Sequence, residues 1–378
     1  MIDRMTVRNY RSLADVEVAF GALTVLVGPN GSGKSNLVDV LRFVSDALQR
    51  GLDAAVIDRH GMSALRRWSG KGRPFNVEIS LELTSGDVEA SYAFTLGSKR
   101  IGEYRVKSEV FSMLVGPLFA GSEGEYATSK GAWTIPPPGS LPGIPPTGLV
   151  LPLLAGRSPF QEVYAALTGM SFYNVLPSKL TELQKPDNPY PLKEHGENLA
   201  SALRELKRTK QDVASRLEAA IRSVMGDVQS YHVSLVSGYL VTKLRHTASL
   251  ADRAPLFELS QESEGTLRML GVLAALYQDP PRTLIALEEP ELNIHPGAMA
   301  LLWEQIASAS DRTQILITTH SPDLLDMCQA DQLRVVEKVD GATVVGPIAQ
   351  DQRQVIQKRL FAPGQLLQAQ GLRRAVQQ

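Results

Sequence analysis

The sequence comprises 378 residues, 43% of them hydrophobic, with a formal net charge of −1 at pH 7. A chain of this length can bury a large core, either in two lobes or in one large domain with an insertion. The balanced charge excludes a global attraction to nucleic acid, and the single cysteine, Cys328, excludes a disulfide framework or a cysteine-cluster metal site.

The N-terminal third predicts a β-loop-α unit followed by an antiparallel sheet. Residues 5–20 predict two short strands, and residues 22–48 predict an apolar strand, a glycine-rich turn and an amphipathic helix. Three segments of alternating polarity follow, at residues 75–83, 89–96 and 104–114. Turn residues separate these segments, which favours antiparallel neighbours over further crossover units.

The middle of the chain predicts an insertion. Residues 134–148, "TIPPPGSLPGIPPTG", are too rich in proline for a helix or a central strand and indicate a surface loop. Residues 194–225 have helical periodicity, with Leu199, Leu203 and Leu206 along one side. About four imperfect heptads are too few for a long coiled coil, so we expect a helical lid or arm.

The C-terminal third returns to strands and helices. Residues 230–246 and 255–259 are β-like, and residues 264–277 predict an apolar helix. Two buried strands are predicted within residues 282–289 and 313–320, separated by a helix over residues 297–310. Finally, residues 333–348 predict a hairpin around Asp340 and Gly341, and a polar tail follows.

Residues 28–35, "GPNGSGKS", fit the phosphate-binding P-loop. A strand is predicted before the motif and a helix after it, which is the context that the motif requires. Glycines let backbone N–H groups face a polyphosphate, Lys34 reaches the β- and γ-phosphate oxygens, and Ser35 ligates Mg²⁺. Chance would produce the pattern in roughly one or two per hundred random chains of this length, so we expect nucleotide binding.

Glu288 and Glu289 stand at the end of the strand "TLIALEEP". Unpaired carboxylates are costly where a buried strand ends, so the pair is solvated, matched by a cation or used in chemistry. Beside a P-loop strand, such an acidic pair indicates a Walker B motif. We expect Glu288 to hold Mg²⁺, directly or through water, and Glu289 to polarise the attacking water. The alternative is an ordinary solvated strand end, which the terminating Pro290 makes less favourable.

His320 follows another apolar strand, in "ITTHSPDLLD". A lone histidine is more often structural. However, strand ends of a parallel sheet meet at the ligand crevice, which raises the odds of a role beside the γ-phosphate.

Five motifs occur in a fixed order: "NYRSL", "GPNGSGKSN", "LSQESEGTLRML", "LEEPELNIHP" and "ITTHSPDLL". Together they resemble the ABC-type ATPases of the RecF/SMC/OLD group, and among these the compact bacterial AAA-family ATPases that lack a transporter. The resemblance covers both ends of the chain, and "HGENLASAL" resembles the lid of that group. It implies an α/β fold, an ABC-type P-loop ATPase head with a mixed sheet, flanking helices, an antiparallel β subdomain and a helical lid or arm insertion.

The resemblance also implies roles for individual residues. In that group the segment matching Ser263, Gly265 and Thr266 is the signature motif, which caps the γ-phosphate of a nucleotide held by a second protomer. Asn293 and His295 fall in the D-loop. Catalysis is expected from Glu289, His320 and Lys34. The residues expected to contact the nucleotide are Arg11, Asn30, Gly31, Gly33, Lys34, Ser35 and Asn36, and those expected at Mg²⁺ are Ser35 and Glu288.

We expect four parts along the chain: residues 1–100 and 233–348 as the two halves of the ATPase head, residues 101–232 as the β and helical insertion, and residues 349–378 as a tail. Compared with the group, there is room only for a short arm instead of a long coiled coil. The residues after His320 contain no Asp-x-Asp pair and no metal-ligand cluster, so we expect no Toprim nuclease domain here.

The resemblance implies a switch that uses ATP and Mg²⁺ and works as a homodimer or larger homo-oligomer. It favours anti-phage defence with a separate nuclease or Toprim-like effector. The alternative is a RecF-like repair ATPase that binds DNA directly, through basic clusters at residues 66–73 and 207–210, each of which is more often a solvated face. A transporter subunit is disfavoured by the motif variants.

The sequence also predicts where the protein works. No apolar run approaches the roughly 18 residues of a membrane helix, and the opening residues lack the apolar block of a signal peptide. We therefore expect a cytoplasmic protein with no membrane partner.

Overall fold

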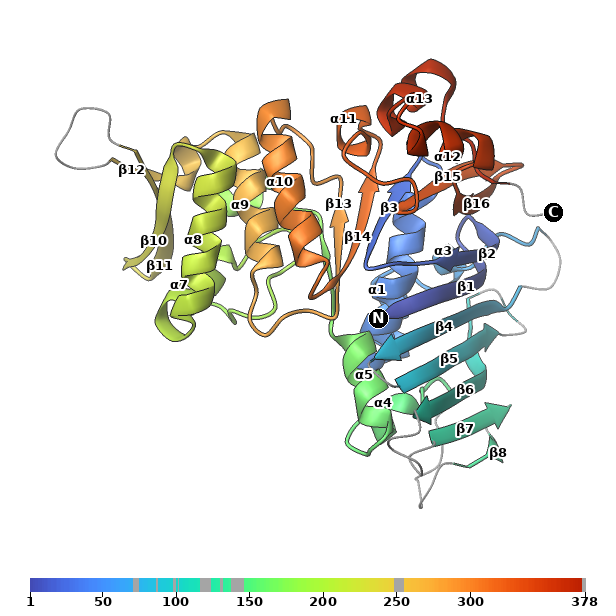
Figure 1. Ribbon diagram of the computed structural model, residues 1–378. Helices are drawn as coiled ribbons and strands as arrows, with labels where there is room; N and C mark the ends of the chain where they lie inside the picture. Colours follow the sequence, from blue (N-terminus) through green and yellow to red (C-terminus); the bar gives the residue numbers. More distant parts are fainter. Residues whose placement is uncertain are drawn as a thin grey trace. The chain divides into compact units, whose positions relative to one another are not determined.

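The chain forms two compact units (Figure 1). The first unit comprises Met1–Met170, Leu333–Arg353 and Leu372–Gln378, and the second comprises Ser171–Gln332 and Gln354–Gly371. The computed structural model describes residues 1–70, 75–85, 88–97, 100, 102–115, 124–129, 132–136, 146–247 and 255–375. The domain boundaries expected from the sequence stay a prediction.

A mixed β-sheet dominates the first unit (Figure 1). Its strands follow the order β8-β7-β6-β5-β4-β1-β2-β16-β15-β3. Neighbours from β8 to β2 run antiparallel, whereas β2 with β16 and β15 with β3 are parallel pairs. The strands are β1 (Ile2–Tyr10), β2 (Leu13–Ala19), β3 (Leu23–Val27), β4 (Val77–Ser85), β5 (Val88–Gly97), β6 (Arg105–Val115), β7 (Gly124–Ser129), β8 (Ala132–Ile135), β15 (Leu333–Val339) and β16 (Ala342–Pro347).

Helix α1 follows the central strand β3 and packs against the sheet through its apolar face. Its buried residues recur at helical spacing, as the amphipathic pattern predicts. Phe43 of α1 lies 5.8 Å from Tyr10 of β1 and 6.4 Å from Phe94 of β5, measured between ring centroids. The helices of this part are α1 (Lys34–Arg50), α2 (Leu52–Ile57), α3 (Met62–Leu65), α4 (Leu151–Leu154) and α5 (Phe160–Thr168).

The second unit combines helices with two groups of strands (Figure 1). Strands β14, β13 and β9 are neighbours in that order, and β13 and β14 are parallel and buried. Strands β10, β11 and β12 form a small antiparallel sheet. These strands are β9 (Met170–Tyr173), β10 (Val228–Val236), β11 (Tyr239–His246), β12 (Leu256–Glu258), β13 (Leu284–Glu288) and β14 (Gln314–Thr319).

The helices of the second unit include those that flank the signature and Walker B segments. They are α6 (Pro177–Thr181), α7 (Leu199–Thr209), α8 (Gln211–Met225), the 3₁₀ turn η2 (Leu259–Gln261), α9 (Glu264–Leu276), α10 (Pro296–Ala309), α11 (Pro322–Leu325) and α13 (Pro363–Gln370). Helix α12 (Gln350–Gln357) bridges the point at which the chain passes from one unit to the other.

The fold class predicted from the sequence is confirmed: a mixed sheet with flanking helices, an antiparallel part and a helical insertion. Two details differ. The expected helical pattern of residues 194–225 is two helices, α7 and α8, which break at Lys210 with φ −135°. The expected polar tail contains helices α12 and α13.

Two expectations fall partly outside the described residues: residues 137–145 of the proline-rich loop, and Lys71 and Arg73 of the first basic cluster. None of the described helices combines the length and the hydropathy that a membrane span needs.

Candidate functional site

The P-loop is a turn that only glycine can build at two positions. At Gly28, an added Cβ atom would lie 2.1 Å from the backbone oxygen of Val336 in β15. Gly33 has φ +109°, and its Cβ would lie 2.1 Å from Oγ1 of Thr343 in β16. Strands β15 and β16 therefore pack so closely on the loop that both glycines are required.

Lys34 begins helix α1 directly after this turn. Its Nζ donates to the backbone oxygens of Gly28, at 2.7 Å, and Pro29, at 3.2 Å, so the buried side chain folds over the loop. In the described residues α1 has no side-chain N-cap, and its first turn contains no acidic residue. The helix N-terminus therefore presents a positive dipole end that suits an anion.

The remaining predicted residues of the loop face outward. Asn30 and Gly31 are exposed at its tip, and Ser35 is exposed in the first turn of α1. These side chains and backbone groups of the first unit are therefore accessible to a nucleotide.

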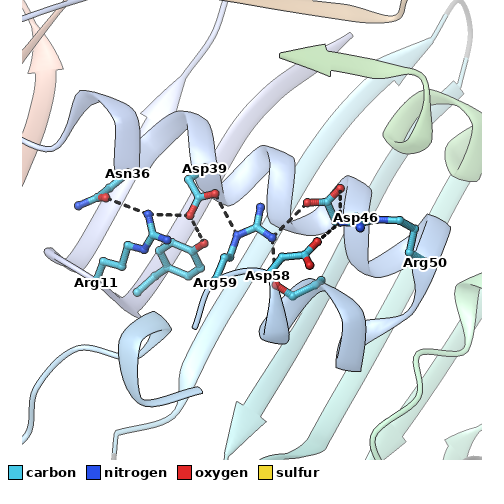
Figure 2. A network of polar contacts seen from close by, with 9 residues as sticks. Arg11, Asn36, Asp39, Asp46, Arg50, Asp58 and Arg59 are labelled. Carbon is cyan, nitrogen blue, oxygen red and sulfur yellow. Dashed lines mark hydrogen bonds and ion pairs between the residues drawn. The ribbon is translucent and has the colours of Figure 1, made fainter. Parts of the chain in front are cut away.

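Arg11 and Asn36 belong to a chain of polar contacts beside the loop (Figure 2). Arg11 Nη1 forms an ion pair with Asp39 Oδ2 at 2.9 Å and lies 3.5 Å from Asn36 Oδ1, at the limit of a hydrogen bond. The backbone of Arg11 has φ +47°, a conformation that non-glycine residues seldom adopt. The two predicted residues Arg11 and Asn36 are therefore brought together, and the turn after β1 holds the guanidinium near α1.

Asp39 continues this chain along α1 (Figure 2). Its Oδ2 accepts from the Tyr10 hydroxyl at 2.6 Å, and its Oδ1 accepts from Arg59 Nε at 2.9 Å. Arg59 also donates to Asp46 Oδ2 at 3.1 Å, and its side chain is only 5% exposed. Burial, together with the charge of Asp39, raises the pKa of Tyr10 well above its ordinary value.

Thr343 connects the C-terminal hairpin to the P-loop. Its hydroxyl donates to the backbone oxygen of Ser32 at 2.8 Å and lies 2.7 Å from the hydroxyl of Ser12. The Ser12 hydroxyl in turn accepts from Asn36 Nδ2 at 2.7 Å. Loop, hairpin and helix are thus joined by one short hydrogen-bonded chain.

In the second unit, Glu289 and His320 lie at the ends of parallel strands. Glu288 is opposite Thr318 in the β13–β14 register, and the backbone N–H of Glu289 donates to Thr318 O at 2.9 Å. Glu289 then adopts φ +44°, which turns the chain out of the strand. His320 Nδ1 lies 3.0 Å from Glu289 Oε1, so the imidazole donates to the carboxylate. The structure therefore brings together Glu289, which is predicted to polarise the attacking water, and His320, which is predicted to lie beside the γ-phosphate.

Glu291, which we did not predict, is a buried acid in the same turn. One of its oxygens accepts from the Thr319 hydroxyl, and Oε2 has no hydrogen-bond partner among the described residues. Burial, and then the charge of Glu289, raise the pKa of Glu291 above its ordinary value of 4.5. Thr319 also accepts from the backbone N–H of Ser321, so Glu291 anchors the segment that carries His320.

The predicted signature residues form the start of α9. The Ser263 hydroxyl caps the helix by accepting from the backbone N–H of Thr266 at 3.1 Å. An added Cβ on Gly265 would lie 2.4 Å from the backbone oxygen of Asn293, and Asn293 Nδ2 donates to Glu264 Oε2 at 2.7 Å. The signature motif and the D-loop are therefore in direct contact within the second unit.

His295, the other predicted D-loop residue, caps α10. Its Nδ1 accepts from the backbone N–H of Gly297 at 3.1 Å, so this histidine has a local structural contact. Asn293 and His295 are both exposed.

Several residues around these positions escaped the sequence reasoning. Glu291 carried a readable signal, because it is the third acid of "EEPE". Ser12 lies within the motif "NYRSL", although no role was predicted for it. Asp39, Arg59 and Thr343 carried no such signal, because their partners lie at sequence distances that follow no period.

The family of protein domains described as "AAA domain, putative AbiEii toxin, Type IV TA system" matches residues 23–326. The match therefore runs from β3 through the P-loop, the signature motif and the Walker B strand. The chain belongs to this AAA family. Two curated relatives extend the finding.

An OLD nuclease of Thermus scotoductus is 21% identical to this AAA chain over 385 residues, which cover 94% of this chain and 66% of the nuclease. A DNA replication and repair protein RecF of Magnetococcus marinus is 37% identical over 62 residues, 16% of each chain. The chain thus spans less than two thirds of the length of either relative.

Solved SMC heads share the fold of this AAA chain. An SMC head bound to the C-winged helix domain of ScpA has a TM-score of 0.61 at 14% identity, covering 93% of this chain and 99% of that one. A Pyrococcus furiosus SMC head bound to the C-terminal domain of ScpA has a TM-score of 0.58 at 13% identity, covering 95% and 99%. At such identities the likeness shows the fold alone. With the family and the relatives, it confirms the predicted membership in the ABC-type RecF/SMC/OLD group.

Proposed function

We propose that this chain is a Mg²⁺-dependent ATPase that works as a molecular switch, with ATP held between two copies. The observation that carries the proposal is the P-loop. Its glycines at positions 28 and 33 are enforced by β15 and β16, and it opens onto the dipole end of α1 with Lys34 folded across it. That arrangement suits a polyphosphate.

In this proposal the first unit binds the nucleotide. Lys34 exchanges its two backbone acceptors for β- and γ-phosphate oxygens, and the amides of Gly31 and Gly33 donate to the phosphates. Arg11, Asn30 and Asn36 complete the polar surround. The hydrogen-bonded chain from Thr343 through Ser12 to Asn36 keeps these groups in place without reorganisation.

The donor set fits Mg²⁺, because Ser35 and Glu288 offer hydroxyl and carboxylate oxygens and neither side chain is buried. We assign these two residues as the ones that would hold it, Glu288 directly or through water. Bound Mg²⁺ would neutralise charge on the β- and γ-phosphates.

We assign the role of general base to Glu289. Because His320 donates to Oε1, that oxygen is fixed and Oε2 is left to take the proton of the attacking water. His320 positions the carboxylate and can also donate to the γ-phosphate.

The signature residues Ser263, Gly265 and Thr266 are proposed to act on the nucleotide of the second copy. The N-terminus of α9 offers a helix dipole and a serine hydroxyl to the γ-phosphate. Asn293 contacts this segment, so D-loop and signature would move together. ATP would then join two copies, and hydrolysis would release them.

For the biological role we propose anti-phage defence, in which the switch controls a separate nuclease or Toprim-like effector in the cytoplasm. The support is the family description, which names a toxin of a toxin–antitoxin system, and the likeness to an OLD nuclease of which this chain spans 66%.

Direct DNA binding, as in a repair ATPase, is the second candidate, favoured by the likeness to RecF. The basic cluster at residues 207–210 gives it little support. Each of its three cations pairs with a carboxylate, and these partners are Glu218, Glu205 and Asp279. In the other cluster Arg66 is buried and Arg67 donates to backbone oxygens.

Steady-state ATP hydrolysis with and without duplex DNA tests the proposal, with Glu289→Gln protein as the blank. If wild-type turnover exceeds that of the blank and does not change with DNA, the result supports a protein effector. Stimulation by DNA would instead favour the DNA-repair function. Wild-type turnover equal to that of the blank contradicts the ATPase assignment.

Sedimentation of the Glu289→Gln protein with and without ATP tests the switch. We expect a dimer with ATP that Ser263→Arg abolishes. The same mass in both conditions would contradict ATP-dependent dimerisation.

A further inference from the structure

His246, the last residue of β11, is held between two carboxylates. Its Nε2 lies 2.8 Å from Glu262 Oε1, and its Nδ1 lies 3.1 Å from Asp227 Oδ2. The imidazole is 17% exposed and the Glu262 side chain 7% exposed, so the first of these contacts is largely shielded from water.

Both ring nitrogens must donate in this arrangement. An ionised carboxylate only accepts hydrogen bonds, and a neutral imidazole carries one N–H. His246 therefore satisfies Glu262 and Asp227 together only as an imidazolium. Burial of the ring opposes this charge, but the hydrogen bonds and charges of Glu262 and Asp227 outweigh it and raise the pKa of His246 above its ordinary value of 6.5.

The contact between His246 and Glu262 matters because of where Glu262 lies in the chain. It immediately precedes Ser263, whose hydroxyl caps α9, while Asp227 lies at the turn between α8 and β10. The ring of His246 also contacts Phe257 of β12 edge-on, at 5.1 Å between centroids. His246 thus ties the segment leading into α9 to the turn between α8 and β10.

Strand β11 holds this segment at further points. Its backbone pairs with β12, and His246 N donates to Pro255 O at 3.1 Å. Lys243 forms an ion pair with Glu258 at 3.0 Å. These contacts fix the strand that precedes the signature motif, whereas His246 alone among them holds the residue adjacent to Ser263.

We propose that His246 is a positioning residue for the signature motif: through Glu262 it fixes Ser263 and the N-terminus of α9 in the geometry that receives the γ-phosphate. This inference rests on the proposed function. It adds to it a residue outside the five motifs and makes the signature segment sensitive to the protonation of one histidine.

The direction of that sensitivity follows from the groups around the ring. Asp227 faces it from the α8–β10 turn and Glu262 from the start of α9, while Glu258 of β12 is paired with Lys243. Because the folded protein binds this proton more tightly than the unfolded chain, the contact is fully formed below pH 6.5 and weakens as the pH rises through the raised pKa. Deprotonation removes one of the two hydrogen bonds and leaves Glu262 shielded from water without a cation.

Amide hydrogen exchange of residues 259–267, corrected for intrinsic rates, tests the positioning without any nucleotide. We compare wild-type protein with His246→Ala and His246→Gln, whose amide keeps one donor that does not titrate. His232→Ala is the matched control, since His232 is exposed on the neighbouring strand β10.

At about pH 6 we expect exchange about tenfold faster in His246→Ala, the loss expected for one charge-assisted hydrogen bond, and no change in His232→Ala. The difference from wild type should shrink as the pH rises above 6.5 through the raised pKa of His246, while His246→Gln shows an intermediate rate without this pH dependence. Equal exchange in wild type and His246→Ala at low pH would overturn the inference.

A kinetic measurement then connects the contact to the site. We expect His246→Ala to lower kcat by about tenfold while the affinity for a fluorescent ATP analogue stays unchanged, because the P-loop belongs to the other unit. Unchanged kcat with altered exchange would refute the link to the signature motif. If wild-type protein hydrolyses no ATP, the proposed function fails, and the exchange data still decide whether His246 holds this segment.

Discussion

His320 Nδ1 donates to Glu289 Oε1 at 3.0 Å across the ends of the parallel strands β13 and β14. The contact depends on the φ of +44° at Glu289, which turns its side chain out of the strand toward the next strand end. The carboxylate and the imidazole therefore form one hydrogen-bonded pair.

Replacing Glu289 by Gln should lower kcat by about 10²- to 10⁴-fold, the usual contribution of a general base, and leave ATP affinity intact. His320→Ala should cost less, about tenfold, because the base remains and only its orientation is lost. Single-turnover hydrolysis with separately measured ATP affinity checks both. If Glu288→Gln is slower than Glu289→Gln, the roles of the two acids are reversed.

Gly33→Ala should destabilise the first unit more than Gly341→Ala. Both residues have positive φ, but a Cβ at Gly33 lies 2.1 Å from Thr343 Oγ1, whereas one at Gly341 meets nothing within 4 Å. Backbone strain alone costs about 1–2 kcal/mol, so the additional loss in Gly33→Ala measures the collision. Urea unfolding and ATP-analogue binding check this. Equal loss of stability in the two variants would argue against close packing of β16 on the P-loop.

Arg59→Ala should cost about 1–3 kcal/mol, because Asp39 and Asp46 each lose a buried hydrogen-bond donor while they keep their ion pairs with Arg11 and Arg50. Arg50→Ala is the control in the same network, since Arg50 pairs with Asp46 and Asp58 but is 49% exposed (Figure 2). Such a surface pair is worth about 0–1 kcal/mol. Comparable small losses in both variants would show that Arg59 is not a structural centre of the network.

Glu291 should make the wild-type protein less stable as the pH rises from 4.5. Its folded-state pKa is raised by burial and by Glu289, so the unfolded chain gives up this proton first and stability falls across the interval up to the raised pKa. Glu291→Gln should remove that part of the slope. Urea midpoints measured from pH 4.5 upward in both proteins isolate it, because Glu109, another buried acid, contributes equally to each. If the urea midpoints of the two proteins change equally with pH, the raised pKa of Glu291 is contradicted.

The sequence was sufficient to predict both the secondary structure and the candidate chemistry wherever one local pattern determined the two together. The P-loop, the Walker B strand and the hairpin at Asp340 are of this kind, because their motif residues and apolar runs are contiguous. The break between α7 and α8 was not predictable, since "KRTKQ" contains neither glycine nor proline and the helical period continues through it.

The polar partners of the site were mostly beyond sequence reasoning. Asp39 is one of two acids in α1, the other being Asp46, and nothing in the neighbouring sequence marks Arg59 as its partner. His246 looks like the end of an ordinary strand, and only the folded chain shows that it lies between Asp227 and Glu262.

The contact of Thr343 with the P-loop constrains how a cell can make this protein. Gly33 and Thr343 are separated by most of the chain. The hairpin that contains Thr343 also pairs with the first strands, β15 with β3 and β16 with β2. At about 5–20 residues per second, a ribosome needs roughly 15–60 s to reach this hairpin after it has passed the loop. The nascent chain should therefore hold the P-loop in its folded geometry only after residues 333–347 have been made, when the other motifs have already been synthesised.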